Sequence, residues 1–98
     1  MNVFILSVMR ETTDFYAENY IETVTTDRQY AFMRMKELFE EEKNSFIQEY
    51  GDDKNIESYI DENNADICYS YLSDYCRCAF VITEKQLVVT KKAQYGGF

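Results

Sequence analysis

The stretch TDRQYAFMRMKELFEEEKNSFIQEYG, residues 26–51, decides the fold of this chain. Thr26 offers an N-cap that forms a capping box with Gln29, and Asp27 adds an acid to the first turn. The apolar side chains then recur at helical spacing, with Gly51 where a helix commonly ends. They are Ala31, Phe32, Met35, Leu38, Phe39, Phe46 and Tyr50. The pattern predicts one long helix over about residues 27–50. The apolar stripe is interrupted at Glu42 and Lys43, so its distal half is expected to bend or to project from the sheet.

The segments on either side of this helix are typical of β-strands. Residues 3–9 and 20–25 predict two strands that form a hairpin through a connection at residues 10–17. After the helix, residues 66–72, 75–83 and 86–90 predict three more strands. Ser73-Asp74 and Glu84-Lys85 are then two-residue turns. Between the helix and these strands, Ile56, Tyr59 and Ile60 at i, i+3 and i+4 predict a short acidic helix over about residues 54–62.

Two-residue turns would fix the register of the three later strands, placing residue 71 opposite 76 and residue 82 opposite 87. Two faces of the sheet follow from this register. The face expected to cover the long helix holds Ile67, Tyr69, Tyr71, Cys76, Cys78, Phe80, Ile82, Leu87 and Val89. The other face holds Cys68, Ser70, Leu72, Tyr75, Arg77, Ala79, Val81, Val88 and Thr90.

These elements predict an α+β fold in the order ββ-α-α-βββ. A mainly antiparallel sheet of about five strands packs on the long helix, and the short helix lies at the far end of the sheet. The 98 residues are enough for one core. Residues 1–98 are therefore predicted to form a single domain, with residues 91–98 as a frayed tail.

The three cysteines, Cys68, Cys76 and Cys78, are predicted to be reduced thiols without a metal. Cys76 and Cys78 are two apart on one strand, too far for a disulfide, and Cys68 falls on the opposite face. No histidine completes a zinc set. The odd number of cysteines leaves open that Cys68 is a reactive surface thiol.

The sequence offers no catalytic constellation. It contains no histidine, which is the commonest general base, and no Gly-rich phosphate-binding motif or nucleophile motif. We therefore expect no enzyme activity and no cofactor. Direct nucleic-acid binding is disfavoured by the net charge of −8.

The first ten residues, MNVFILSVMR, lack a basic leader and a small-residue cleavage site, so they predict a strand and not a signal peptide. No apolar run is long enough to span a membrane. A cytoplasmic location, in the host cell if the chain is phage-encoded, is expected by default.

Negative charge is concentrated in residues 37–66, which hold eleven of the eighteen acids and only two bases, Lys43 and Lys54. Such a block either keeps the protein soluble or forms a surface that binds a basic protein. Acids at helical steps of three and four can imitate the spacing of phosphates. The predicted partner-binding residues are Glu40, Glu41, Glu49, Asp52, Asp53, Glu57, Asp61 and Glu62.

The whole chain resembles the small, acidic, stand-alone proteins of phages and mobile elements, among them the anti-CRISPR proteins. The resemblance is carried by a VFILSVM strand at the start, the ββ-α-βββ order, a composition rich in Tyr, Asn, Glu and Lys, and the lack of an enzyme motif. Many members of that group occupy the nucleic-acid channel of a nuclease. The resemblance involves no motif, so it assigns no functional residue.

Two functional hypotheses follow. The first is a non-enzymatic inhibitor or adaptor that uses its acidic surface to bind a basic protein, such as a CRISPR nuclease or another nucleic-acid-handling protein. The alternative is a homo-oligomeric module that associates through an exposed sheet face or edge and holds a small ligand between protomers. That face or edge would include Leu72, Tyr75, Val81 and Val88.

Overall fold

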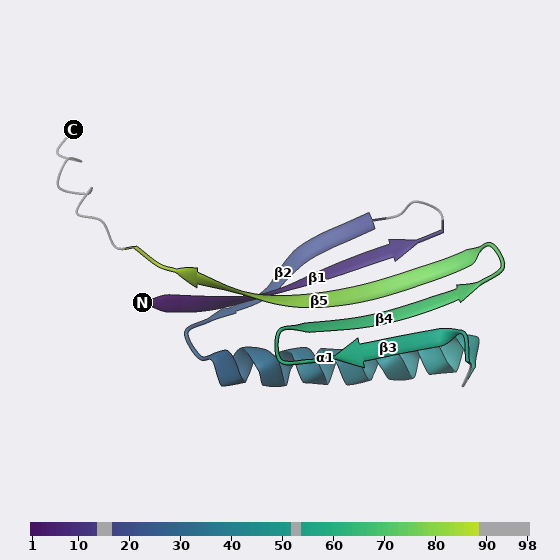
Figure 1. Ribbon diagram of the computed structural model, residues 1–98, viewed down its shortest axis with the longest axis horizontal. Helices are drawn as coiled ribbons and strands as arrows, with labels where there is room; N and C mark the ends of the chain where they lie inside the picture. The colour runs from purple at the N-terminus through teal and green to yellow at the C-terminus, as the bar shows by residue number, and fades with distance from the viewer. Residues whose placement is uncertain (14–16, 52–53, 89–98) are drawn as a thin grey trace.

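The computed structural model describes residues 1–13, 17–51 and 54–88 (Figure 1). Within these ranges the chain forms one helix and five strands. In chain order they are β1 (Asn2–Thr12), β2 (Ala17–Thr25), α1 (Arg28–Tyr50), β3 (Ile56–Ile60), β4 (Asn64–Tyr71) and β5 (Asp74–Gln86). The predicted tail at residues 91–98 and the end of the predicted strand at residues 86–90 lie outside the described residues, as do Asp52 and Asp53.

The five strands form one antiparallel sheet in the order β2-β1-β5-β4-β3. β1 lies between β2 and β5, so the first and the last described strands of the chain pair along most of their length. Helix α1 packs on one face of the sheet (Figure 1). We call the opposite face, which no described element covers, the bare face. The α+β class and the predicted number of strands are thus confirmed.

The core lies between α1 and the sheet. Leu6, Met35 and Ile67 have no exposed surface, and each contributes about 1.5–3 kcal/mol through burial of its side chain. The predicted helical stripe is confirmed, since Ala31, Met35, Phe39 and Phe46 are buried, and Phe32, Leu38 and Tyr50 pack against them.

The distal half of α1 stays on the sheet, so the expectation that it bends away or projects is wrong. Phe46 is buried, and the ring of Tyr50 stacks on Tyr69 of β4 with 3.9 Å between centroids. At the interruption of the stripe, Glu42 turns toward the sheet and forms an ion pair with Arg10. Its carboxylate accepts hydrogen bonds from both terminal nitrogens of the guanidinium.

The start of the helix also differs from the prediction. Its N-cap is Asp27, which accepts hydrogen bonds from the backbone of residues 29 and 30, and Thr26 plays no such part.

The predicted short helix over residues 54–62 is wrong, because this segment forms the edge strand β3. Ile56 and Ile60 share one face of a strand as well as one face of a helix, and pairing with β4 decides between the two. A helix of nine residues has too few hydrogen bonds to resist that pairing.

The predicted turn at Glu84-Lys85 and the separate strand over residues 86–90 are also wrong. β5 continues through residues 84 and 85, which pair with Phe4 and Val3 of β1. Leu87 and Val88 follow the end of β5 and are exposed.

The β4–β5 turn is formed by Leu72 and Ser73, one residue earlier than predicted, so that Tyr71 pairs with Asp74. The register between these strands is therefore shifted by two residues. A shift of two leaves each side chain on the same face, so the predicted faces of the β4–β5 hairpin survive the error. Ile67, Tyr69, Cys78, Phe80 and Ile82 are buried on the helix side as expected.

Candidate functional site

Three exposed acids of α1, Glu40, Glu41 and Glu49, form what we call the acidic face. Glu40 and Glu41 are on the outer side of the helix, and Glu49 lies beside Tyr50 and Cys76. None of them forms an ion pair with another described residue. The other two acids of this part of the helix are neutralised. Glu37 pairs with Arg34 at 3.0 Å, and Glu42 pairs with Arg10 against the sheet.

One acid of the acidic face, Glu49, lies where the helix dipole disfavours it. Glu49 is in the last turn of α1, and Glu40 and Glu41 are just beyond its middle. The first turn contains no acid and the last turn no base, which is the reverse of the arrangement that stabilises a helix. The dipole acts within the first and last turns, so this cost of a few tenths of a kcal/mol falls on Glu49 and not on Glu40 or Glu41. The position of Glu49 is therefore not explained by helix stability.

The other predicted partner-binding residues that the structure describes, Glu57, Asp61 and Glu62, do not join the acidic face. Glu57 is an exposed residue of β3, and it pairs there with Cys68, which lies on the bare face. Asp61 and Glu62 lie in the β3–β4 turn, and Arg28 at the start of α1 bonds Asn63 of the same turn at 2.6 Å. That turn is at the opposite end of α1 from Glu49. The structure thus divides the predicted acidic surface into separate groups.

Asp61 has a structural task in its turn. Its carboxylate accepts hydrogen bonds from the backbone nitrogens of Asn63 and Asn64, both at 2.8 Å, and from the hydroxyl of Tyr59. These bonds hold the pKa of Asp61 below its ordinary value, with the Tyr59 hydroxyl as the largest cause. Its lone pairs are therefore used within the turn, which leaves little of this carboxylate for a partner.

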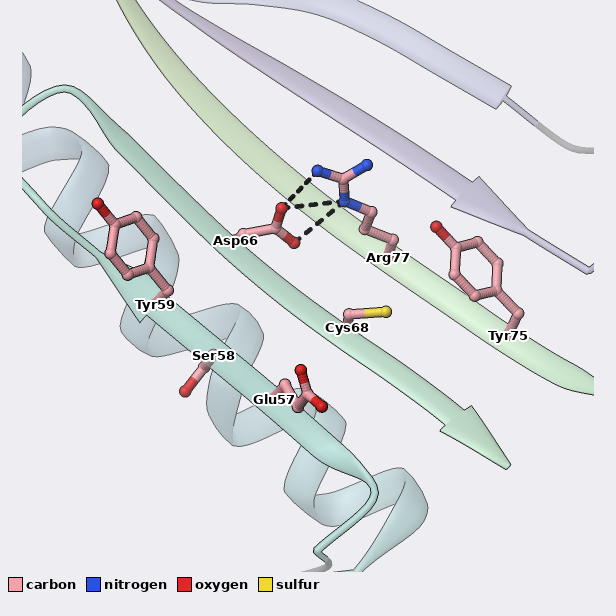
Figure 2. A pocket seen from close by; sticks show the side chains of 7 residues that line it. All are labelled: Glu57, Ser58, Tyr59, Asp66, Cys68, Tyr75 and Arg77. Atoms are coloured by element: carbon pink, nitrogen blue, oxygen red, sulfur yellow. Dashed lines mark hydrogen bonds and ion pairs between the residues drawn. The ribbon is translucent and has the colours of Figure 1, made fainter. Parts of the chain in front are cut away.

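The bare face carries a polar hollow of about 440 Å³ over β3, β4 and β5 (Figure 2). It is lined by Glu57, Ser58, Tyr59, Asp66, Cys68, Tyr75 and Arg77. Figure 2 shows Arg77 and Asp66 joined by dashed lines at its centre, with Cys68 beside them. The guanidinium donates from Nε to both carboxylate oxygens of Asp66, at 3.0 and 3.1 Å.

The groups in the polar hollow satisfy one another. Arg77 also lies 3.7 Å from Glu11, whose carboxylate accepts a hydrogen bond from the hydroxyl of Tyr75. The hydrogen bonds with Asp66 raise the pKa of Arg77, so its charge is held against the carboxylates and is not offered to an anion. Such a cluster can position a polar ligand by hydrogen bonds, but it contains no activated nucleophile.

Cys68 and Cys78 lie on the opposite faces of the sheet that were predicted for them. All three are free, and Cys68 faces the polar hollow while Cys78 is buried on the helix side. Burial raises the pKa of all three and brings that of Cys78 to about 12. Protonated thiols are poor nucleophiles, so the reactive-thiol alternative for Cys68 gains no support.

Over residues 1–13, 17–51 and 54–88, the cysteine and acidic side chains nowhere form a group of three that could hold a metal ion. The same part of the chain forms no helix with the length and apolar character that crossing a membrane requires. A cytoplasmic location stays a prediction.

Sequence reasoning missed two charged clusters, Arg10 with Glu42 and Asp66 with Arg77. Each was hidden by an error of arrangement. The interruption at Glu42 was expected to bend the helix away from the sheet. The register error of two residues placed Asp66 opposite Val81, whereas the structure pairs it with Ala79, beside Arg77. A search for cross-strand partners of opposite charge would have favoured the observed register.

No family model matches the chain, and comparisons with curated proteins and with solved structures also gave no match.

Proposed function

We propose that this protein is a non-enzymatic inhibitor or adaptor that binds a basic, nucleic-acid-handling protein through the acidic face of α1. The observation that carries the proposal is the exposure of Glu40, Glu41 and Glu49 without an ion pair to any described residue. Unneutralised carboxylates on a rigid helix attract a basic surface and speed its association.

The unfavourable position of Glu49 in the last turn of α1 supports a role outside folding. An acid selected only for solubility would be as useful near the start of α1, where the dipole would stabilise it. Residues that work against local stability are commonly found at functional sites. The acids between residues 40 and 49 span about 14 Å along the helix axis, at a rise of 1.5 Å per residue. That length suits a groove built for a nucleic-acid backbone.

The net charge of −8 supports a protein partner over nucleic acid itself. Proteins whose channels hold DNA or RNA present the arginines and lysines that the acidic face would pair with. A CRISPR nuclease is one partner of this class, and it would be inhibited if α1 occupied its nucleic-acid channel.

The test is the binding of the purified protein to a guide-loaded CRISPR nuclease, and to other purified proteins with basic nucleic-acid channels, at rising salt. We expect the dissociation constant to increase with salt, and duplex DNA to compete for the same partner. The double variant Glu40→Lys with Glu41→Lys should weaken binding by at least about 100-fold, since each reversal costs over 1 kcal/mol at a charged interface.

A matched control reverses two exposed acids elsewhere, Asp74→Lys with Glu84→Lys. It changes the net charge by the same amount and leaves the acidic face intact, so binding should change by less than about threefold. Equal losses in the two double variants would mean that only net charge matters. That result, or binding that resists both salt and the first reversal, contradicts the proposal.

A further inference from the structure

The bare face is unusually apolar for a sheet surface that faces water. Along β1 its positions are Val3, Ile5, Ser7, Met9 and Glu11, so three of five are apolar on the face where an antiparallel strand normally presents polar residues to solvent. The neighbouring strands add to it, with Ile21 63% exposed, Val24 59% and Val81 41%. We call this set the apolar patch; it consists of Val3, Ile5, Met9, Ile21, Val24, Ala79 and Val81.

The apolar patch is continuous across three neighbouring strands. In β1, Ile5 pairs with Val24 of β2, and Met9 pairs with Ala79 of β5. Ser7 lies between them and pairs with Ile21 on one side and Val81 on the other. A second hollow, of about 300 Å³, lies over this region and is lined in part by Ser7, Met9 and Val81. Side chains of a packing surface could enter it.

The bare face is large enough for a stable association. Five strands about 4.8 Å apart, each rising about 3.3 Å per residue over roughly nine residues, give a face of about 700 Å². Two such faces in contact bury about 1,400 Å², which lies within the standard range for specific protein interfaces. The single helix of the described chain lies on the other side, so the face is open over its whole area.

The distribution of charge over the molecule favours a second copy of this chain as the partner that covers the bare face. The acids of the bare face, Glu11, Glu57 and Asp66, are nearly balanced by Arg77 and Lys85, and the apolar patch itself contains no charge. A basic partner is therefore drawn to the acidic face of α1 and not here. A second copy of this chain, with its own net charge of −8, meets the least repulsion on this surface.

We infer that two copies of this chain pack their bare faces together about a two-fold axis near Ser7, with patch against patch. Each apolar patch then covers its own equivalent, as the symmetry of an isologous dimer requires. Two sheets packed in this way lie about 10 Å apart, and the two α1 helices form the outer layers of the dimer. The contact of the two faces also covers the polar hollow, whose Arg77–Asp66 pair is already satisfied within each chain. This inference does not depend on the proposed function.

Light scattering coupled to size exclusion tests the inference, since the dimer has twice the 11.7 kDa mass of the chain. We expect a dimer that tightens as salt rises, because salt screens the repulsion between two acidic copies and leaves apolar contact intact. Ile21→Lys and Val81→Lys should each raise the dimer dissociation constant at least tenfold, the effect of a buried hot-spot residue. The control Tyr20→Lys introduces the same charge on the same strand but on the other face, and should leave the dimer intact.

A monomer at high micromolar concentration in high salt overturns the inference. So does a dimer that is dissociated by Ile21→Lys but not by Val81→Lys, because that result places the interface at the free edge of β2. Circular dichroism shows whether each variant retains its fold, and Val81→Ser replaces Val81→Lys if the latter does not fold. Since binding of a basic partner weakens with salt and the dimer strengthens, failure of one does not count as failure of the other.

Discussion

The ion pair between Arg10 and Glu42 is the residue-scale feature that joins α1 to β1. The guanidinium donates to both oxygens of the carboxylate, and the side chains are 36% and 20% exposed. The hydrogen bonds with Glu42 raise the pKa of Arg10, against the effect of burial. A charged pair at this position replaces the apolar contact that the helical stripe leads one to expect. The sequence shows only the gap in the stripe, because the partner of Glu42 is 32 residues away.

Removing the charge of Glu42 should destabilise the protein. Glu42→Gln removes the carboxylate charge and at least one of the two hydrogen bonds with the half-buried Arg10, at a cost of about 1–3 kcal/mol. Urea unfolding followed by circular dichroism measures the change. The matched control is Glu40→Gln, two residues away on the exposed side, which should change the free energy of unfolding by less than about 0.5 kcal/mol.

A double variant tests whether an apolar pair can replace the ion pair between α1 and β1. Arg10→Met with Glu42→Leu should recover most of the loss, because a well-packed apolar pair commonly equals a buried ion pair in stability. If Glu42→Gln is as stable as the parent protein, the pair contributes nothing to the packing of α1.

At the scale of elements, the helix and the faces of the β4–β5 hairpin could be predicted from the sequence, but the strand β3 and the end of β5 could not. The helix was predictable because its apolar stripe, N-cap region and Gly51 agree with one another. The faces were predictable because alternation survives a register error of two residues. By contrast, β3 and the end of β5 depend on pairing with strands distant in the chain, β4 and β1. Local patterns do not contain that information.

The β4–β5 turn has a strained residue, and relief of the strain should stabilise the hairpin. Leu72 is 88% exposed and has a φ of 56°, as the first central residue of a type II′ turn does. This conformation costs a side-chain-bearing residue about 1–2 kcal/mol and suits glycine. Leu72→Gly should therefore raise the free energy of unfolding by about 0.5–1 kcal/mol, measured by thermal melting.

The neighbouring turn residue provides the control. Among the described residues other than glycine, only Leu72 has a positive φ, so Ser73→Gly relieves no strain. It adds backbone freedom to the unfolded chain and should lower stability slightly. A gain in both variants would show that the turn conformation is not the cause.

At the scale of the whole molecule, the partner-binding and self-association surfaces lie on opposite sides of a two-layer protein. The acidic face is on α1, and the apolar patch is on the far side of the sheet. The sequence showed the acids and a partly apolar second face. It could not show that Glu57 and the β3–β4 turn lie apart from the acidic face, because that separation follows from β3 being a strand.

If both proposals hold, the dimer presents two acidic faces that point in opposite directions. One basic partner should then bind per protomer, and the monomeric variant Ile21→Lys should bind a partner in solution with an unchanged dissociation constant. On a surface dense with immobilised partner, the dimer should dissociate at least about tenfold more slowly than Ile21→Lys, since two linked contacts must break together. Surface plasmon resonance at low and high partner density measures both quantities. Tyr20→Lys should behave like the parent protein, because it leaves the bare face unchanged. Weaker binding of Ile21→Lys in solution would instead mean that the partner contacts the bare face, and that the two surfaces do not act separately.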